Sequence, residues 1–289
     1  MINPPPVVEH RVPTRQGTIC VRDYAGTEPA FVLMHGLPDN QGIYDDLVPY
    51  LAAAGRRVTT FDFLGFGASD KPKGAAYGYA QQLGDLEAVI DGLDLAPVVL
   101  VPHDSSGFAG LNYAIEHPER VASVCMLNSA YADATGAHWP EMIELAATPN
   151  LRALSDAILR QPDQFGWLLG WQQEQFRAAL PPAQQARFVD LIGKLIEANF
   201  TANSSALPAY AQMTAQFYAE IDRNVARLPL LTKLDLPIRL IWGEFDPYLT
   251  VAMAEARLVH LKNGSLQRVA GGHWLQSDAP MAVARALLT

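Results

Sequence analysis

Short, almost wholly apolar runs recur through the first 129 residues of this chain, and helix-like stretches separate them. Residues 31–34 (FVLM) and 98–101 (VVLV) are such runs, which are typical of strands buried on both faces of a sheet. Residues 79–95 lie between them and carry apolar side chains at helical spacing. Strands that alternate with helices in this way predict a mostly parallel, doubly wound α/β sheet.

The alternation then ends. Residues 132–226 have helical patterns without a convincing strand, whereas residues 236–246 and 266–274 return to the pattern of strand and loop. We therefore expect one α/β core, formed by residues 1–131 and 227–289, with a helical cap inserted between its two segments.

Composition narrows the classes of function. The 289-residue chain has a formal net charge of −9 and no basic patch, so a nucleic-acid partner is not expected. Its two cysteines, Cys20 and Cys125, lie in strand-like segments and indicate no disulfide framework. The first residues lack a signal-peptide pattern and the apolar runs are too short to cross a bilayer, so we expect a cytoplasmic protein without membrane association.

The histidines and acidic residues show no metal-ligand spacing, and the one glycine-rich turn lacks the third glycine of a dinucleotide fingerprint. We therefore expect no metal and no cofactor. The expected partner is a small-molecule substrate. No feature of the sequence indicates an oligomeric state.

A polar cluster follows the second apolar run in the stretch VPHDSSGF, residues 101–108. A strand, a sharp turn and a helix in succession are typical of a nucleophile elbow, whose tip presents the reactive side chain. Asp104, Ser105 and Ser106 are the three candidates for the tip. The alternative is that Asp104 only caps the helix that follows.

Steric space favours Asp104 over its neighbours. Strand and helix pack tightly at an elbow, so the residues two before and two after the tip must be small. Around Asp104 these positions hold proline and serine, whereas around Ser105 one holds histidine and around Ser106 one holds phenylalanine. The sequence therefore predicts Asp104 as the nucleophile and leaves Ser105 as the second choice.

Two further side chains follow later strands. Asp246 lies just past one strand end and His273 lies in a loop past the last strand, which gives the chain order Asp, Asp, His of an α/β-hydrolase triad. The turn HGLP, residues 35–38, follows another strand. We expect the backbone N–H groups of Leu37 and Ser105 to form an oxyanion hole there.

Four motifs resemble the α/β-hydrolase fold, and more narrowly its haloalkane dehalogenase and epoxide hydrolase branch. They are HGLP, FDFLGFGASDKP (residues 61–72), PHDSSG (residues 102–107) and GGHWLQSDAP (residues 271–280). The resemblance covers both core segments and is weak across the expected cap. It implies that Asp104 is the nucleophile and that His273 is the base.

An aspartate at the tip suits attack on a saturated carbon, which produces an ester between Asp104 and the substrate. His273, oriented by Asp246, then activates a water that hydrolyses the ester. The electrophiles that fit this chemistry are small to medium apolar alkyl halides and epoxides. The alternatives are a carboxylesterase that uses Ser105 and a ligand-sensing protein without catalysis.

Three positions depart from the family pattern. Ser105 stands where these dehalogenases have a tryptophan that binds the leaving halide, and Leu37 stands where one subgroup has a halide-binding asparagine. Asn128 stands where that subgroup has its acid, which is why Asp246 is expected to take that role.

Residues of the expected cap are candidates to stabilise the leaving group. Trp139, Trp167 and Trp171 offer indole N–H donors to a halide, and Tyr218 offers a proton donor to an opening epoxide. A tryptophan in an apolar cap helix is more often a packing residue, and for Tyr218 packing is an equal alternative.

Overall fold

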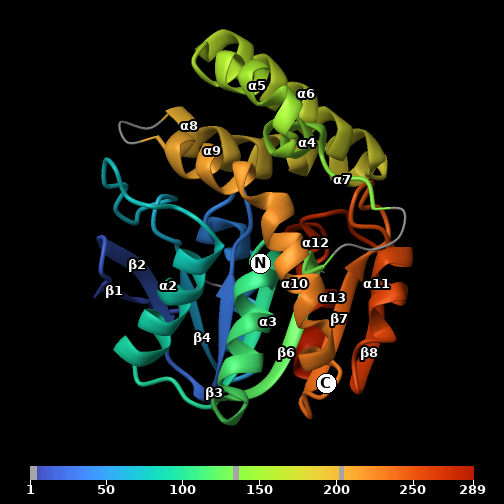
Figure 1. Ribbon diagram of the computed structural model, residues 1–289. Helices are drawn as coiled ribbons and strands as arrows, with labels where there is room; N and C mark the ends of the chain where they lie inside the picture. Colours follow the sequence, from blue (N-terminus) through green and yellow to red (C-terminus); the bar gives the residue numbers. More distant parts are fainter. Residues whose placement is uncertain (1–4, 133–136, 202–204) are drawn as a thin grey trace.

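The computed structural model describes residues 5–132, 137–201 and 205–289. Within these ranges one eight-stranded sheet forms the centre of the molecule, in the order β1-β2-β4-β3-β5-β6-β7-β8 (Figure 1). Its strands are β1 Val8–Pro13, β2 Thr18–Tyr24, β3 Thr27–Met34, β4 Arg56–Phe61, β5 Val98–Asp104, β6 Val121–Ser129, β7 Pro237–Gly243 and β8 Asn263–Val269. β2 runs antiparallel to both of its neighbours, β1 and β4, and the other five pairs are parallel, so the expected mostly parallel sheet is confirmed.

Helices cover both faces of the sheet. They are α1 Val48–Ala53, α2 Tyr79–Gly92, α3 Gly107–Glu116, α11 Val251–Leu258, α12 Leu275–Asp278 and α13 Pro280–Leu288, with short turns η1 Gln41–Tyr44 and η2 Pro118–Arg120. The chain moves from β3 to β4 in one direction and from β4 to β5 in the other, so right-handed connections place α1 and α2 on opposite faces. Accordingly α2 packs beside α3, and α1 packs against α13.

The central strands explain the apolar runs. Residues 30–34 of β3 and 98–102 of β5 are buried throughout, because helices cover the sheet on both sides. Most of the edge strand β8 is exposed, and its sequence is correspondingly polar. No helix in the described ranges is both long enough and apolar enough to span a membrane.

A layer of helices lies over one end of the sheet (Figure 1, top). Its members are α4 Glu141–Ala147, η3 Pro149–Leu151, α5 Arg152–Leu159, α6 Pro162–Ala179, α7 Pro182–Arg187, the π-helical turn η4 Phe188–Gly193, α8 Lys194–Thr201 and α9 Leu207–Ala215. The helix α10, Phe217–Leu231, descends from this layer to pack beside α3. The boundary expected at residues 226 and 227 therefore falls inside a continuous helix, and the cap as a separate folding unit stays a prediction.

The turn from β5 into α3 leaves no space for a side chain at its first helical residue. A Cβ added to Gly107 would lie 2.2 Å from the carbonyl oxygen of Ala130 and 2.3 Å from the Ser129 hydroxyl. The same approach joins β5 to β6, because the Ser129 hydroxyl donates to the carbonyl of Asp104 at 2.6 Å. Glycine at this position lets α3 start directly behind the turn.

We expect Gly107→Ala to lower the free energy of unfolding by about 1–3 kcal/mol, because the added methyl group forces backbone atoms apart. Gly84→Ala is the matched control. Gly84 lies inside α2 at an exposed position with nothing within 4 Å of an added Cβ, so alanine there should stabilise by about 0.5–1 kcal/mol. Urea unfolding of both variants measures the difference, and equal effects would contradict the steric argument.

Candidate active site

Asp104 ends β5 in a backbone conformation that is rare for a residue with a side chain. Its φ is +53°, in the left-handed region, which marks it as the tip of the sharp turn before α3. A Cβ on Gly36 would lie 2.2 Å from the Cβ of Asp104, so the turn that follows β3 can approach only as glycine. This approach brings the Leu37 backbone N–H to Asp104, where it donates to Oδ1 at 2.8 Å.

His273 lies between two carboxylates. Its Nδ1 is 2.7 Å from Asp246 Oδ2, a good hydrogen bond, and its Nε2 is 3.5 Å from Asp104 Oδ2, a contact better described as an ion pair. Asp104 ends β5, Asp246 follows β7 and His273 follows β8, so the carboxyl ends of parallel strands bring the three together.

Asp246 is held rigidly from three sides. Its Oδ1 accepts the backbone N–H groups of Tyr248 and Leu249, at 2.9 Å and 3.0 Å. Its Oδ2 accepts a hydrogen bond from the side-chain NH₂ group of Asn128 at 2.7 Å. The side-chain Oδ1 of Asn128 in turn accepts the Gly243 backbone N–H at 2.6 Å. Asn128 thus orients the acid from the strand end at which a subgroup of the resembled family has an acid of its own.

The charges of the three groups depend on one another. Burial raises the pKa of Asp104, but the close contact with His273 and its charge outweigh burial and hold that pKa below its ordinary value. Burial lowers the pKa of His273, but the charge of Asp246 and the contacts with Asp104 raise it to about 10. At neutral pH these two shifts favour an imidazolium at His273 and a carboxylate at Asp104.

The two backbone N–H groups predicted to form an oxyanion hole are those of Leu37 and Ser105. The Leu37 N–H already contacts the Asp104 carboxylate. Among the described residues the Ser105 N–H has no hydrogen-bond partner, and Ser105 directly follows the tip of the turn. Such N–H groups can stabilise negative charge that develops on the Asp104 carboxyl.

Asp104, Ser105 and His273 line a cavity between the sheet and the helix layer, with about 790 Å³ of space not filled by atoms up to its open mouth. Its helix-layer wall is apolar and aromatic, with Trp139, Met142, Leu169, Phe176, Ile196 and Phe217 among its residues. An apolar lining with a few polar side chains is typical of a small-molecule pocket.

The structure brings one of the four aromatic candidates to this cavity. Trp139 lines it, buried against Phe217 with ring centroids 4.9 Å apart. Trp167 is 69% exposed and Trp171 is half-buried, and neither lines the cavity. Tyr218 also lies outside the lining, where its hydroxyl donates to Glu144 at 2.6 Å.

Helical geometry explains these placements. The side of α6 that lines the cavity carries Leu169, Gln172, Gln173 and Phe176, spaced at three- and four-residue intervals. Trp167 and Trp171 are offset from that series and so project from other sides of the helix. Tyr218 is likewise displaced by one residue from the cavity-lining Phe217 on α10.

Sequence reasoning missed three tyrosines that line the cavity: Tyr79, Tyr210 and Tyr248. Tyr248 was the one with a usable signal, because it lies two residues after Asp246 at a strand end. Its hydroxyl donates to Glu141 at 2.5 Å and accepts from Gln172 at 2.6 Å.

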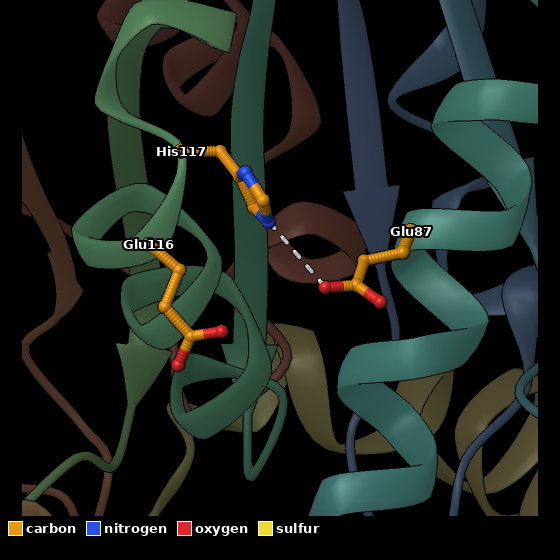
Figure 2. A group of neighbouring side chains, drawn as sticks. All are labelled: Glu87, Glu116 and His117. Atoms are coloured by element: carbon orange, nitrogen blue, oxygen red, sulfur yellow. Dashed lines mark ion pairs between the residues drawn. The ribbon is translucent and has the colours of Figure 1, made fainter.

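One group of described residues has metal-ligating atoms close together: Glu87, Glu116 and His117 (Figure 2). His117 Nε2 pairs with Glu87 Oε1 at 3.5 Å, and Glu116 is already paired with Arg227 at 2.7 Å. Glu116 ends α3, the helix that begins beside Asp104, so the group lies at the opposite end of that helix. Because these side chains are partly exposed and have protein partners, we assign no metal to them.

Comparison with known proteins places this geometry in context. A model of the alpha/beta hydrolase fold family matches residues 29–280. Haloalkane dehalogenase 1 of Mycobacterium tuberculosis is 28% identical over 269 residues, which cover 90% of this chain and 83% of that protein.

Solved structures share the fold across different chemistries. A haloalkane dehalogenase from Agrobacterium tumefaciens has a TM-score of 0.70 at 22% identity, covering 97% of this chain and 94% of that one. A thermophilic esterase from Thermogutta terrifontis has a TM-score of 0.74 at 21% identity, covering 98% of this chain and 97% of that one. The fold alone therefore does not select the reaction.

A second buried carboxyl, Asp39, lies beside the site. Its Oδ2 accepts from the Trp274 indole at 2.9 Å, and the Trp274 ring packs edge-on against His273. Burial raises the pKa of Asp39 to about 7, and burial lowers the pKa of His103 to about 3. His103 Nδ1 lies 3.6 Å from Asp39 Oδ2, but a neutral His103 makes no ion pair with Asp39.

We expect Asp39→Asn to stabilise the protein at about pH 8 and to have little effect near pH 4. The folded-state pKa of Asp39 lies above its unfolded value, so ionisation of this carboxyl opposes folding increasingly as pH rises between the two values. The asparagine stays neutral and should raise the free energy of unfolding by up to about 4 kcal/mol. Urea unfolding across this pH range measures the effect.

Asp163→Asn, at an exposed position on α6, controls for the loss of one carboxylate. If the free energies of unfolding of the parent and of Asp39→Asn changed in parallel with pH, ionisation of Asp39 would not be what destabilises the parent at high pH.

Proposed function

Because this chain belongs to the alpha/beta hydrolase fold family, we propose that it is a hydrolase in which Asp104 forms a covalent ester with its substrate. The observation that carries the proposal is that the elbow tip is an aspartate in contact with His273 and the Leu37 N–H. The Ser105 hydroxyl has no hydrogen bond to His273, and a serine nucleophile needs that bond for activation.

The first step is displacement at a saturated carbon. The Leu37 N–H holds Oδ1 of Asp104, so Oδ2 attacks. A bond forms between Oδ2 and the carbon, and the bond from that carbon to the leaving group breaks, with its electron pair going to the leaving group. The low pKa of Asp104 supports this step, because the carboxylate is ionised at neutral pH.

The second step is hydrolysis of the ester. Once esterified, Asp104 carries no charge, so His273 loses one of the two carboxylates that raise its pKa and can release its proton. The neutral imidazole then takes a proton from water, which attacks the Asp104 carbonyl carbon. The N–H groups of Leu37 and Ser105 stabilise the resulting oxyanion. As it collapses, the bond from the Asp104 carbonyl carbon to the substrate oxygen breaks, and His273 returns its proton to that oxygen. An alcohol is released, and the new Asp104 carboxyl group loses its proton to solvent.

The substrate we propose is a small to medium apolar alkyl halide or epoxide. The apolar cavity supports an apolar substrate, and the relative from Mycobacterium tuberculosis is named as a haloalkane dehalogenase. A halide leaves as an anion. An epoxide oxygen stays attached to the product and must receive a proton.

We expect His273→Gln to accumulate an adduct on the peptide that contains Asp104. The variant can still be alkylated but lacks the base for the second step, which typically contributes about 10²–10⁴-fold in rate. Mass spectrometry after incubation with each substrate measures the gain. An alkyl halide adds its alkyl group, and an epoxide adds the whole molecule, so the mass separates the two chemistries.

His260→Gln, at a partly buried position after α11, is the matched control and should show no adduct. Asp104→Asn should show neither turnover nor adduct. A His273→Gln enzyme that neither hydrolyses nor is alkylated, alongside an active parent, would rule out the covalent mechanism.

The pH dependence of trapping provides a second test. In His273→Gln the contact that lowers the pKa of Asp104 is lost, so burial dominates and that pKa rises. We therefore expect the adduct to form faster at about pH 9 than at about pH 6, because only the ionised carboxylate attacks. Asp246→Asn keeps His273, so its rate of adduct formation should depend less on pH. Stopped reactions followed by mass spectrometry give the rates, and faster alkylation at the lower pH would contradict this account.

A further inference from the structure

Two hydroxyls on the cavity wall lack partners. Tyr79 and Ser105 both line the cavity and are 3% and 4% exposed, and neither hydroxyl has a hydrogen-bond partner among the described residues. Burying a hydroxyl without a partner is costly, and where such a hydroxyl belongs to a cavity wall, a bound ligand can accept its hydrogen bond.

The other hydroxyl and amide side chains on this wall are already engaged. The Tyr210 hydroxyl donates to the carbonyl of Met142 at 3.2 Å, and the Tyr248 hydroxyl donates to Glu141. Gln173 donates to the carbonyl of Gly193 at 3.3 Å. Tyr79 and Ser105 therefore differ from their neighbours in having hydrogen-bonding capacity left for a bound molecule.

Both hydroxyls belong to the surroundings of the nucleophile. Ser105 is the residue after Asp104. Tyr79 begins α2 and packs edge-on against Phe108, which lies in the first turn of α3, with ring centroids 4.8 Å apart. The two side chains thus flank the start of α3, the helix that follows the elbow.

We propose that the Tyr79 and Ser105 hydroxyls form the subsite for the leaving group of the substrate. This inference rests on the proposed function. As the bond between Asp104 and carbon forms and the bond to the leaving group breaks, both hydroxyls donate hydrogen bonds to the departing anion. They take the place of the tryptophan and asparagine donors that are absent at Ser105 and Leu37.

The surroundings of Tyr79 favour a halide over an alkoxide. Burial raises the pKa of Tyr79 well above its ordinary value, and the charges of Asp104 and Glu220 raise it further. Tyr79 therefore keeps its proton and acts as a hydrogen-bond donor. A halide departs as a stable anion and needs no proton, whereas the oxygen of an opened epoxide must be protonated.

The test compares Tyr79→Phe with the parent on a chloroalkane, a bromoalkane and an iodoalkane of the same carbon skeleton. Chloride is the poorest of the three leaving groups and the strongest hydrogen-bond acceptor, so its departure depends most on the lost donor. We expect kcat/KM to fall about 10- to 100-fold for the chloride and distinctly less for the iodide. Chloride should also inhibit the variant more weakly than it inhibits the parent.

Tyr113→Phe is the matched control. Tyr113 is fully buried in α3, and its hydroxyl has no partner in the part of the chain that the structure describes, but it does not line the cavity. Its loss should leave the rates and their dependence on the halide unchanged. Ser105→Ala should show the same halide dependence as Tyr79→Phe, and Ser105→Thr, which keeps a hydroxyl, should restore much of the activity on the chloride.

The other outcomes overturn the inference. Equal losses for chloride and iodide, with adducts still trapped in His273→Gln, would mean that the proposed function holds and that solvent alone satisfies these hydroxyls. A halide-dependent loss in Trp139→Phe in place of Tyr79→Phe would make the indole the donor. Loss of epoxide opening alone would make Tyr79 a proton donor to an alkoxide. If no halide or epoxide alkylates Asp104, the proposed function and this inference fail together.

Discussion

The buried imidazolium between Asp104 and Asp246 is the interaction on which the rest of the site depends. Removing three charges from water is costly unless each is paired and hydrogen-bonded. Here Asp246 accepts three hydrogen bonds besides its contact with His273, and Asp104 accepts the Leu37 N–H. These groups come from the ends of five strands, so the charges are paired in this way only in the assembled sheet.

The sequence predicts the parts of this arrangement that local chemistry determines. Strands buried on both faces must be nearly all apolar, which is why the central strands were identifiable, and reactive side chains follow them at one edge of the sheet. The elbow at Asp104 was predicted from the small size of its neighbours. The structure adds that positions 36 and 107 must be glycine, because a Cβ at either position would lie 2.2 Å from another atom of the protein.

Tertiary packing determines what the sequence could not reveal. A single step along a helix turns a side chain by about 100°, so Phe217 lines the cavity and Tyr218 pairs with Glu144. The pattern of an amphipathic helix does not tell which side will face a pocket when both sides are covered. Tyr79 had no motif to mark it, since its relation to Asp104 arises only where α2 packs beside α3.

The helix α10 has a consequence for how such proteins can be recombined. It starts among the helices above the sheet and continues without a break to Leu231, alongside α3. An exchange of the upper layer between related enzymes, with joints at residues 131 and 227, would sever this helix in its third turn. A chimera therefore needs to carry α10 whole or to place its joint beyond Leu231.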